Sequence, residues 1–204
     1  MAIYVKISVK GDVIRQLKKI CPCFTYMSGK SEKIKLADDK RKQTWYPLKV
    51  KRTVKNAKFC KCYCANRTGC NLIQDIFSHP GILPIKKNTS LGDGSQYQFR
   101  KNYMSFNAYK RVNIDTDKGK KRAKAHLQFA HELVHALDDL NGKIPNGPTF
   151  EQRREFEERA VRGTNQIRQD QGLKYHRTTH SGITVRQPTN TEIDGNDRWN
   201  CDCP

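Results

Sequence analysis

The strongest chemical signal in this 204-residue chain is the run His131-Glu132-Leu133-Val134-His135. Two histidines four residues apart on a helix lie one turn apart on the same face, so both imidazoles can bind one Zn²⁺ ion. Glu132 lies about 100° further round that helix and can reach a water on the open position of the ion. Zinc lowers the pKa of such a water towards ~7, and the carboxylate takes its proton as the water attacks a peptide carbonyl. The run therefore predicts zinc-dependent peptide hydrolysis with Glu132 as general base; a pair of surface histidines without metal is the alternative.

A catalytic zinc ion needs a third protein ligand. The metzincin arrangement places a histidine six residues after the second one, but that position holds Asn141. In the gluzincin arrangement the ligand is a glutamate on a downstream helix. The next predicted helix offers four candidates: Glu151, Glu155, Glu157 and Glu158.

Helical geometry separates these glutamates. The apolar residues of the helix define an inward arc, formed by Ala160, Val161 and Ile167. At 100° per residue, Glu157 falls within this arc, whereas Glu155 and Glu158 fall outside it. We therefore predict Glu157 as the third ligand and Glu158 as the second choice. A solvated charge paired with a neighbouring arginine is the alternative for any one of them.

Two amphipathic helices must position these side chains. The first is predicted over residues 123–140, where apolar residues recur at helical spacing and an Asn-Gly pair follows as a stop. The second is predicted over residues 150–171, where Thr149 and Gln152 form the residue pair of a capping box.

The remaining elements are expected to be short. Alternating apolar and polar residues over 3–9 indicate a half-buried strand, and Gly11-Asp12 indicates a turn before a short helix over 13–20. After a polar, lysine-rich stretch, the sequence predicts a helix and a strand within 71–87, and then two short strands within 97–114.

The runs from His131 to Gly142 and from Glu157 to Leu173 resemble the NleD-like zinc metallopeptidases, which are bacterial effectors and toxin domains. The residues that match the pattern of the second helix and the segment after it are Glu157, Glu158, Ala160, Val161, Gly163, Asn165, Ile167, Arg168, Gly172, Leu173 and Arg177. The resemblance covers about residues 69–182 and is specific over 127–177. It implies a gluzincin-type peptidase that is secreted or translocated into a host or target cell, where it cleaves a protein. Family members cleave signalling proteins such as kinases.

The chain departs from the family after Arg177, where relatives tend to have Tyr and this sequence has His180. Either side chain can donate a hydrogen bond to a developing oxyanion. His180 is therefore one candidate for that catalytic role, and Tyr175 is the other, with His176 as a further competitor.

Four further polar residues are candidates for supporting roles. Asp138 or Asp139 could accept a hydrogen bond from a metal-binding imidazole and orient its ring. The alternative for both residues is a charged side chain at the end of the helix without such a role. Asn165 and Arg168 are expected to be structural, tying the end of the second helix to its neighbours.

Together these features predict an α+β fold: a small zincin-like domain with two ligand-bearing helices and a short sheet. We expect three parts, which are a basic Cys-rich N-terminal portion (1–68), the metallopeptidase domain (69–182) and a C-terminal tail with a Cys pair (183–204). The only cofactor predicted is Zn²⁺ at His131, His135 and Glu157.

Eight cysteines leave three interpretations open: disulfides, a structural zinc site or free thiols. They fall in two CxC pairs, a CxCxC run and one further position, namely Cys21, Cys23, Cys60, Cys62, Cys64, Cys70, Cys201 and Cys203. An even count favours disulfides in an exported chain. The CxCxC run with Cys70 six residues later is an irregular spacing for structural zinc.

The formal net charge of +19 is unevenly distributed. Residues 1–125 hold 29 Lys and Arg against 8 Asp and Glu, a balance of +21, whereas residues 126–204 hold 10 against 12. The basic part suggests a protein substrate with an acidic docking surface, with nucleic acid as the less favoured partner. A solvated surface is the alternative.

Apolar runs are too short for a membrane-spanning helix, and no secretory leader is visible in residues 1–10. The rival function is a basic, Cys-stapled or zinc-binding module that binds nucleic acid or an acidic protein without proteolysis.

Overall fold

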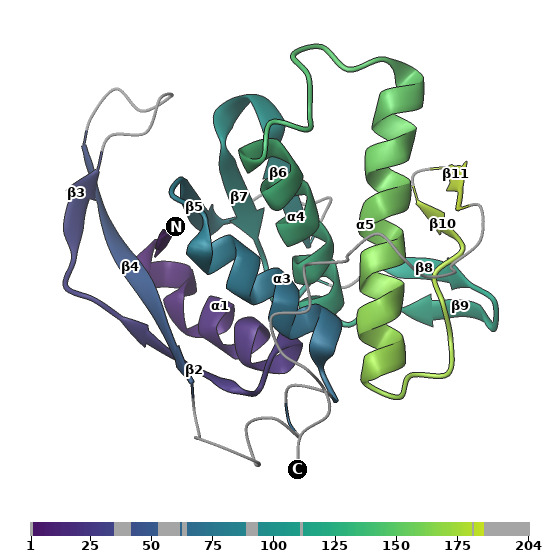
Figure 1. The fold of residues 1–204 in the computed structure, drawn as a ribbon, viewed down its shortest axis with the longest axis horizontal. Helices are drawn as coiled ribbons and strands as arrows, with labels where there is room; N and C mark the ends of the chain where they lie inside the picture. The colour runs from purple at the N-terminus through teal and green to yellow at the C-terminus, as the bar shows by residue number, and fades with distance from the viewer. Residues whose placement is uncertain are drawn as a thin grey trace.

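The computed structural model describes residues 2–34, 42–52, 62, 65–88, 94–110, 112–180 and 182–185. They form both helices and runs of successive strands, which confirms the α+β class (Figure 1). The strands are β1 (Ala2–Val5), β2 (Phe24–Ser28), β3 (Glu32–Ile34), β4 (Gln43–Arg52), β5 (Ile82–Lys87), β6 (Ser95–Gln98), β7 (Tyr103–Phe106), β8 (Asn113–Thr116), β9 (Gly119–Arg122), β10 (Thr179–His180) and β11 (Ile183–Thr184). The helices are α1 (Ile7–Ile20), α3 (Arg67–Ser78), α4 (Ala125–Leu140), α5 (Phe150–Asp170) and the 3₁₀ turn η1 (Phe99–Lys101).

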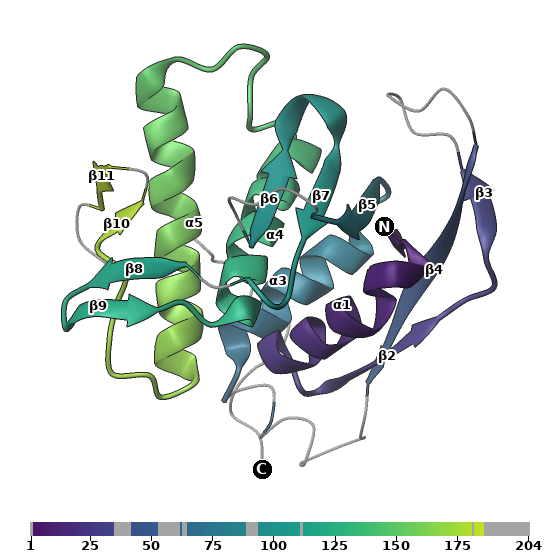
Figure 2. The same cartoon turned by 180° about the vertical axis from the view of Figure 1, so that it is seen from behind.

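One mixed sheet organises the molecule. Its strand order is β2-β4-β1-β5-β7-β6. The short strand β3 also pairs with β4, along the first residues of β4, whereas β2 pairs with its later residues. The pairs β1–β5 and β5–β7 are parallel, and the other pairs are antiparallel. Two further hairpins, β8–β9 and β10–β11, stand apart from this sheet beside α5 (Figure 2). The strand β6 therefore forms one edge of the main sheet.

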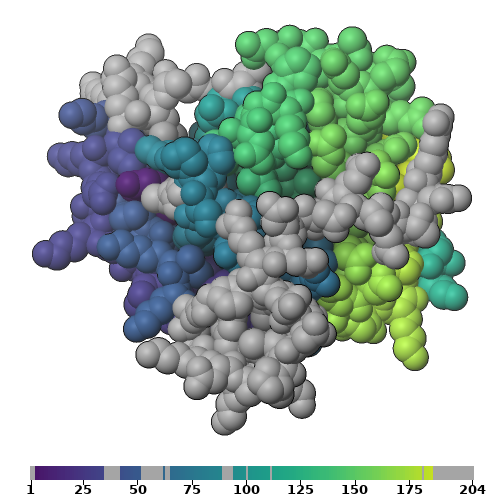
Figure 3. All heavy atoms as spheres, in the orientation of Figure 1, coloured from purple at the N-terminus to yellow at the C-terminus, as the bar shows by residue number. Residues whose placement is uncertain are grey.

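The helices form two successive layers. Helices α1 and α4 pack directly on the strands, and α3 and α5 pack on α1 and α4. Phe129, Leu133 and Ala136 of α4 are fully buried between the sheet and the outer helices. Figure 3 shows the N-terminal elements and α5 on opposite sides of the molecule. None of the helices in the described part of the chain is long and apolar enough to cross a membrane.

The first twenty residues differ from the prediction. The strand ends at Val5 and α1 begins at Ile7, so the predicted strand over 3–9 and the turn at Gly11-Asp12 are wrong. The alternation in the sequence is also compatible with a helix, because Val9, Val13 and Leu17 recur every four residues and are buried on one face. A Cβ on Gly11 would meet nothing within 4 Å, so this glycine imposes no turn.

The lysine-rich stretch after α1 contains strands that the sequence analysis did not predict. Strand β4 pairs with β1, β2 and β3, with Trp45 and Leu48 buried. The strands β1 and β4 from residues 1–68 share one sheet with β5 and β7 from residues 69–182. Residue 68 is therefore not a boundary of the sheet.

The later helices and β5 agree with the prediction, whereas the region 97–114, expected to hold two short strands, contains η1 and parts of three strands, β6, β7 and β8. The helix and strand expected within 71–87 are α3 and β5, and the helix expected over 123–140 is α4. Helix α5 begins with the predicted capping box: the Thr149 side chain accepts from the Gln152 backbone N–H, and the Gln152 side chain accepts from the Thr149 backbone N–H.

Candidate metal centre

Helices α4 and α5 lie side by side and bring together three side chains that can bind a metal. His131 and His135 project from α4, and Glu157 projects from α5. The two histidine Nε2 atoms are 3.2 Å apart, and each is 3.2 Å from Oε2 of Glu157. The three atoms form an equilateral triangle.

This triangle has the size that a small tetrahedral cation requires. Three ligands about 2.0–2.1 Å from a tetrahedral zinc ion lie roughly 3.3 Å from one another. Both imidazoles are buried, so the cluster is reached from the Glu157 side. Two histidines and one glutamate also form the donor set of catalytic zinc sites that keep a fourth position open. The predicted metal-binding group therefore exists in the structure.

The structure separates the two leading glutamate candidates. Glu157 belongs to the metal-binding group, whereas Glu158 is bound by Arg154 at 3.1 Å and lies 3.9 Å from Arg162. Although burial opposes the shift, hydrogen bonds from His131 and His135 hold the pKa of Glu157 well below its usual range. The carboxylate of Glu157 is therefore ionised, as a metal ligand must be.

The electrostatic environment differs between the two imidazoles. Burial lowers the pKa of His131 to about 3, with the Glu157 hydrogen bond opposing it. For His135 burial is outweighed by the hydrogen bond to Glu157 and by the charges of Glu132 and Asp138, so its pKa is raised.

Glu132 is held beside the cluster by the sheet edge. The backbone N–H of Tyr97 in β6 donates to its Oε2 at 2.7 Å. Burial raises the pKa of Glu132 to about 7, while His135 and the Tyr97 N–H oppose that shift. A carboxyl group with such a pKa can accept and return a proton near neutral pH.

Of the two candidates for the oxyanion donor, the structure brings only His180 to the cluster. Its Nε2 lies 2.9 Å from Oε2 of Glu157, and its ring packs edge-on against His131 at 4.6 Å. Tyr175 instead hydrogen-bonds the side chain of Arg168, and His176 pairs with Asp117.

The predicted carboxylate partners of the imidazoles are engaged elsewhere. Asp138 pairs with Arg159 at 3.0 Å, and Asp139 accepts from the Tyr97 hydroxyl at 2.7 Å. Within the described residues, Nδ1 of His131 and Nδ1 of His135 are buried without a hydrogen-bond partner. Asp138 therefore acts on His135 only through its charge.

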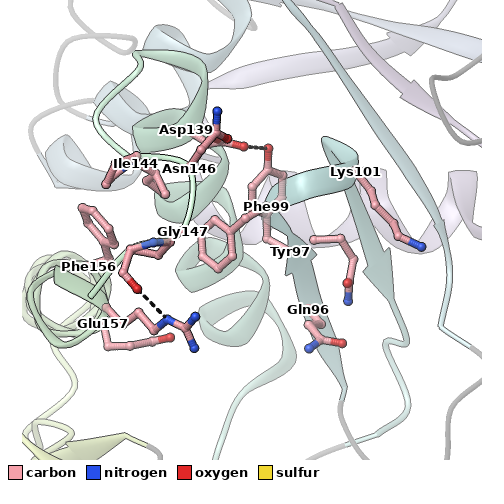
Figure 4. A pocket seen from close by; sticks show the side chains of 14 residues that line it. Gln96, Tyr97, Phe99, Lys101, Asp139, Ile144, Asn146, Gly147, Phe156 and Glu157 are labelled. Carbon is pink, nitrogen blue, oxygen red and sulfur yellow. Dashed lines mark hydrogen bonds between the residues drawn. The ribbon is translucent and has the colours of Figure 1, made fainter. Parts of the chain in front are cut away.

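A cavity of about 480 Å³ opens beside Glu157 (Figure 4). Tyr97 and Phe99 line one side, and Ile144 and Phe156 line the other, with Glu157 at one end. The Phe99 ring packs edge-on against both Tyr97 and His135, at 5.4 Å in each case. Neither Tyr97 nor Phe99 belongs to a recognisable motif, so their place at the site could not be predicted from the sequence.

Four cysteines form a second group, in which Cys21, Cys23 and Cys70 are buried and Cys62 is partly buried. The structure contains the disulfides Cys21–Cys70 and Cys23–Cys62, and Sγ of Cys23 lies 3.6 Å from Sγ of Cys70. The sulfur atoms of Cys21, Cys23 and Cys70 are close enough together to hold a metal ion if they were thiolates. The other four cysteines lie outside the described residues: Cys60, Cys64, Cys201 and Cys203.

Comparisons of the chain with protein-family models, with curated proteins and with solved structures found no match.

Proposed function

We propose that this protein is a zinc-dependent endopeptidase of the gluzincin type. The observation that supports this proposal best is the convergence of His131, His135 and Glu157 from two helices into a triangle of 3.2 Å sides. Glu132 and His180 lie next to this group, and a cavity able to hold a substrate side chain opens beside it.

Each residue has a defined part in the proposed reaction. A zinc ion bound by His131, His135 and Glu157 would supply Lewis acidity that activates water and polarises a peptide carbonyl. Glu132 accepts the proton of the attacking water and returns it to the leaving amine. His180 donates from its imidazole to the carbonyl oxygen as negative charge develops there.

The proposed biological role comes from the resemblance to NleD-like enzymes. We propose an effector or toxin that is secreted or translocated into a target cell and cleaves a protein there, such as a signalling kinase. The resemblance is most specific over residues 127–177. This range supports the proposed role, because it includes the ligand-bearing parts of α4 and α5.

The test combines metal analysis with peptide cleavage. The chain is loaded with zinc and incubated with a peptide library, and Glu132→Gln is compared with the unchanged protein. We expect Glu132→Gln to retain one zinc per chain and to lose about 10²–10⁴-fold in cleavage rate, the usual contribution of a general base. Arg162→Met is the control: the half-exposed Arg162 side chain lies near Glu158 and not near the metal-binding group, so both quantities should be unchanged. Undiminished cleavage by Glu132→Gln would show that the mechanism is wrong.

A second candidate function is a basic binding module that recognises nucleic acid or an acidic protein. It is favoured by β9, whose residues Lys120, Lys121 and Arg122 are all exposed. For this function we expect binding to RNA or DNA that weakens steeply with salt and is lost when these three residues are neutralised. The proposed peptidase would keep its cleavage of short peptides in the same variant.

A further inference from the structure

The contact between Arg177 and His180 determines which nitrogen of His180 can carry a proton. Nη2 of Arg177 lies 2.7 Å from Nδ1 of His180. On the other side of the ring, Nε2 lies 2.9 Å from Oε2 of Glu157. The imidazole is thus held between a cation and a carboxylate.

A guanidinium group has only N–H donors and no acceptor. Nδ1 of His180 must therefore accept the hydrogen bond from Arg177, which leaves the proton of the neutral ring on Nε2. The opposite tautomer would set N–H against N–H at Arg177 and a lone pair against the carboxylate at Glu157. Both contacts would be repulsive.

We infer that Arg177 is a positioning residue that holds His180 in the Nε2–H tautomer, with its donor directed toward the metal-binding group. This inference rests on the proposed function for the catalytic use of that donor, but the tautomer itself is a property of the chain. A tyrosine hydroxyl at this position would need no such control, because it is a donor in its neutral form.

Arg177 is itself held in place from two sides. Its backbone N–H donates to Oδ1 of Asn165 at 2.8 Å, and its carbonyl accepts from Nδ2 of Asn165 at 2.9 Å. Arg168 donates to the same Oδ1 at 2.7 Å, and Nε of Arg177 donates to the Thr179 carbonyl at 2.7 Å. The guanidinium group therefore has little freedom to turn away from His180.

The hairpin β8–β9 holds the same segment from outside α5. Thr116 forms a bridge with Arg177, and the Thr178 N–H donates to the Asp115 carbonyl at 3.0 Å. Burial lowers the pKa of Arg177, but carboxylates that include Glu157 and Asp115 oppose the shift. The guanidinium keeps its charge and its donor role.

The test is a measurement of the His180 tautomer by long-range ¹H–¹⁵N NMR, on the full chain with and without added zinc. The His180 signals are assigned by their loss in His180→Gln. We expect a protonated, pyrrole-type Nε2 and an unprotonated, pyridine-type Nδ1 in the unchanged protein. Arg177→Lys should retain this pattern, since an ammonium group is also only a donor. Arg177→Met should shift the tautomer population, whereas the control Arg162→Met should not.

Two results would overturn the inference: a proton on Nδ1 in the unchanged protein, or an unaltered tautomer in folded Arg177→Met. If Arg177→Met does not fold, the unchanged protein and Arg177→Lys still decide the question. In a cleavage assay, Arg177→Met should lower kcat by about 10²-fold, within the range for loss of one oxyanion donor, with KM changed less than twofold. The Nε2–H tautomer together with no cleavage by any zinc-loaded variant would refute the proposed function and leave the tautomer assignment intact.

Discussion

Glu157 and Glu158 are neighbours in sequence, but their carboxylates have different partners. Glu157 contacts three histidines, whereas Glu158 contacts two arginines. We predict that Glu157→Ala weakens zinc binding by more than about 100-fold, because loss of an outer hydrogen-bond partner alone costs about 10–100-fold. Glu158→Ala should bind zinc as tightly as the unchanged chain, although it leaves Arg154 without its carboxylate partner. Competition with a zinc chelator measures both affinities, and equal losses in the two variants would contradict the ligand assignment.

Local geometry explains which site residues could be predicted from the sequence. His131 and His135 are related by one helical turn, and Glu157 lies on the apolar side of an amphipathic helix. Both relations are contained in a short stretch of sequence. The contact of Arg177 with His180, and that of Tyr97 with Glu132, depend on how a hairpin and a sheet edge meet α4 and α5. These two contacts cannot be predicted from the residue pattern within any one segment.

At the scale of the elements, α1, α4 and α5 are joined by a small polar contact. The amide of Gln171 donates to the Lys19 carbonyl at 2.8 Å, and its oxygen lies 3.0 Å from Nε2 of His126. His126 is only 7% exposed, and burial lowers its pKa to about 4. The neutral imidazole therefore serves as the donor to Gln171.

This contact predicts a pH dependence of stability. The pKa of His126 is near 6.5 in the unfolded chain and about 4 in the folded one, so the unfolded state binds the proton first. The contribution of neutral His126 to the free energy of unfolding is fully present above pH 6.5 and is lost as the pH falls toward 4. The total loss is up to about 3 kcal/mol. Thermal unfolding is measured at several pH values between 7 and 4. The melting temperature of His126→Gln should fall less steeply with decreasing pH than that of the unchanged protein. Parallel curves would contradict this assignment.

The close approach of α1 and α3 gives a second prediction at this scale. A Cβ on Gly69 would collide with the backbone carbonyl of Ile20, and the neighbouring Cys70 is disulfide-bonded to Cys21. We expect Gly69→Ala to lower the free energy of unfolding by about 1–3 kcal/mol, as overpacking in a core does.

Gly11→Ala is the matched control for Gly69→Ala. It also lies within a helix, but its Cβ would meet nothing within 4 Å. Alanine there should raise the free energy of unfolding by about 0.5–1 kcal/mol, because glycine is a poor helix former. Denaturant titration measures both variants, and a harmless Gly69→Ala would show that α1 and α3 are further apart than described.

At the scale of the whole molecule, the order of strands in the sheet could not be predicted from the sequence. Helices α4 and α5 are marked by apolar faces and by a helix stop or a capping box, and the sequence predicts their ends to within two residues. Helix α3 has an apolar face but begins at Arg67, four residues before the predicted start. Strand β4 has a proline at position 47 and lysines at 49 and 51, so its composition does not indicate a strand. Only its pairing with β1 and β2 makes it a strand. The β1 partners lie more than forty residues away in the chain, as with Ile3 opposite Leu48.

The two disulfides connect the end of α1 and the start of β2 to the region around α3. They join residues 49 and 39 positions apart in the chain. By the chain-entropy estimate each stabilises the fold by about 4 kcal/mol. We predict that dithiothreitol lowers the melting temperature strongly, and that the double variant Cys21→Ser/Cys70→Ser reproduces part of this loss. Uptake of a second zinc ion by the reduced chain, with no loss of stability, would instead show that these thiols form a metal site.

The place of β1 in the sheet has a consequence for any change that removes this strand. Residues 2–5 form a central strand, with β4 on one side and β5 on the other. Loss of these few residues would delete the middle of the sheet. The backbones of β4 and β5 would then face each other across an empty slot, each with unpaired N–H and C=O groups. Such edges recruit strands from other chains, so loss of this one short strand would turn the folded chain into a template for aggregation.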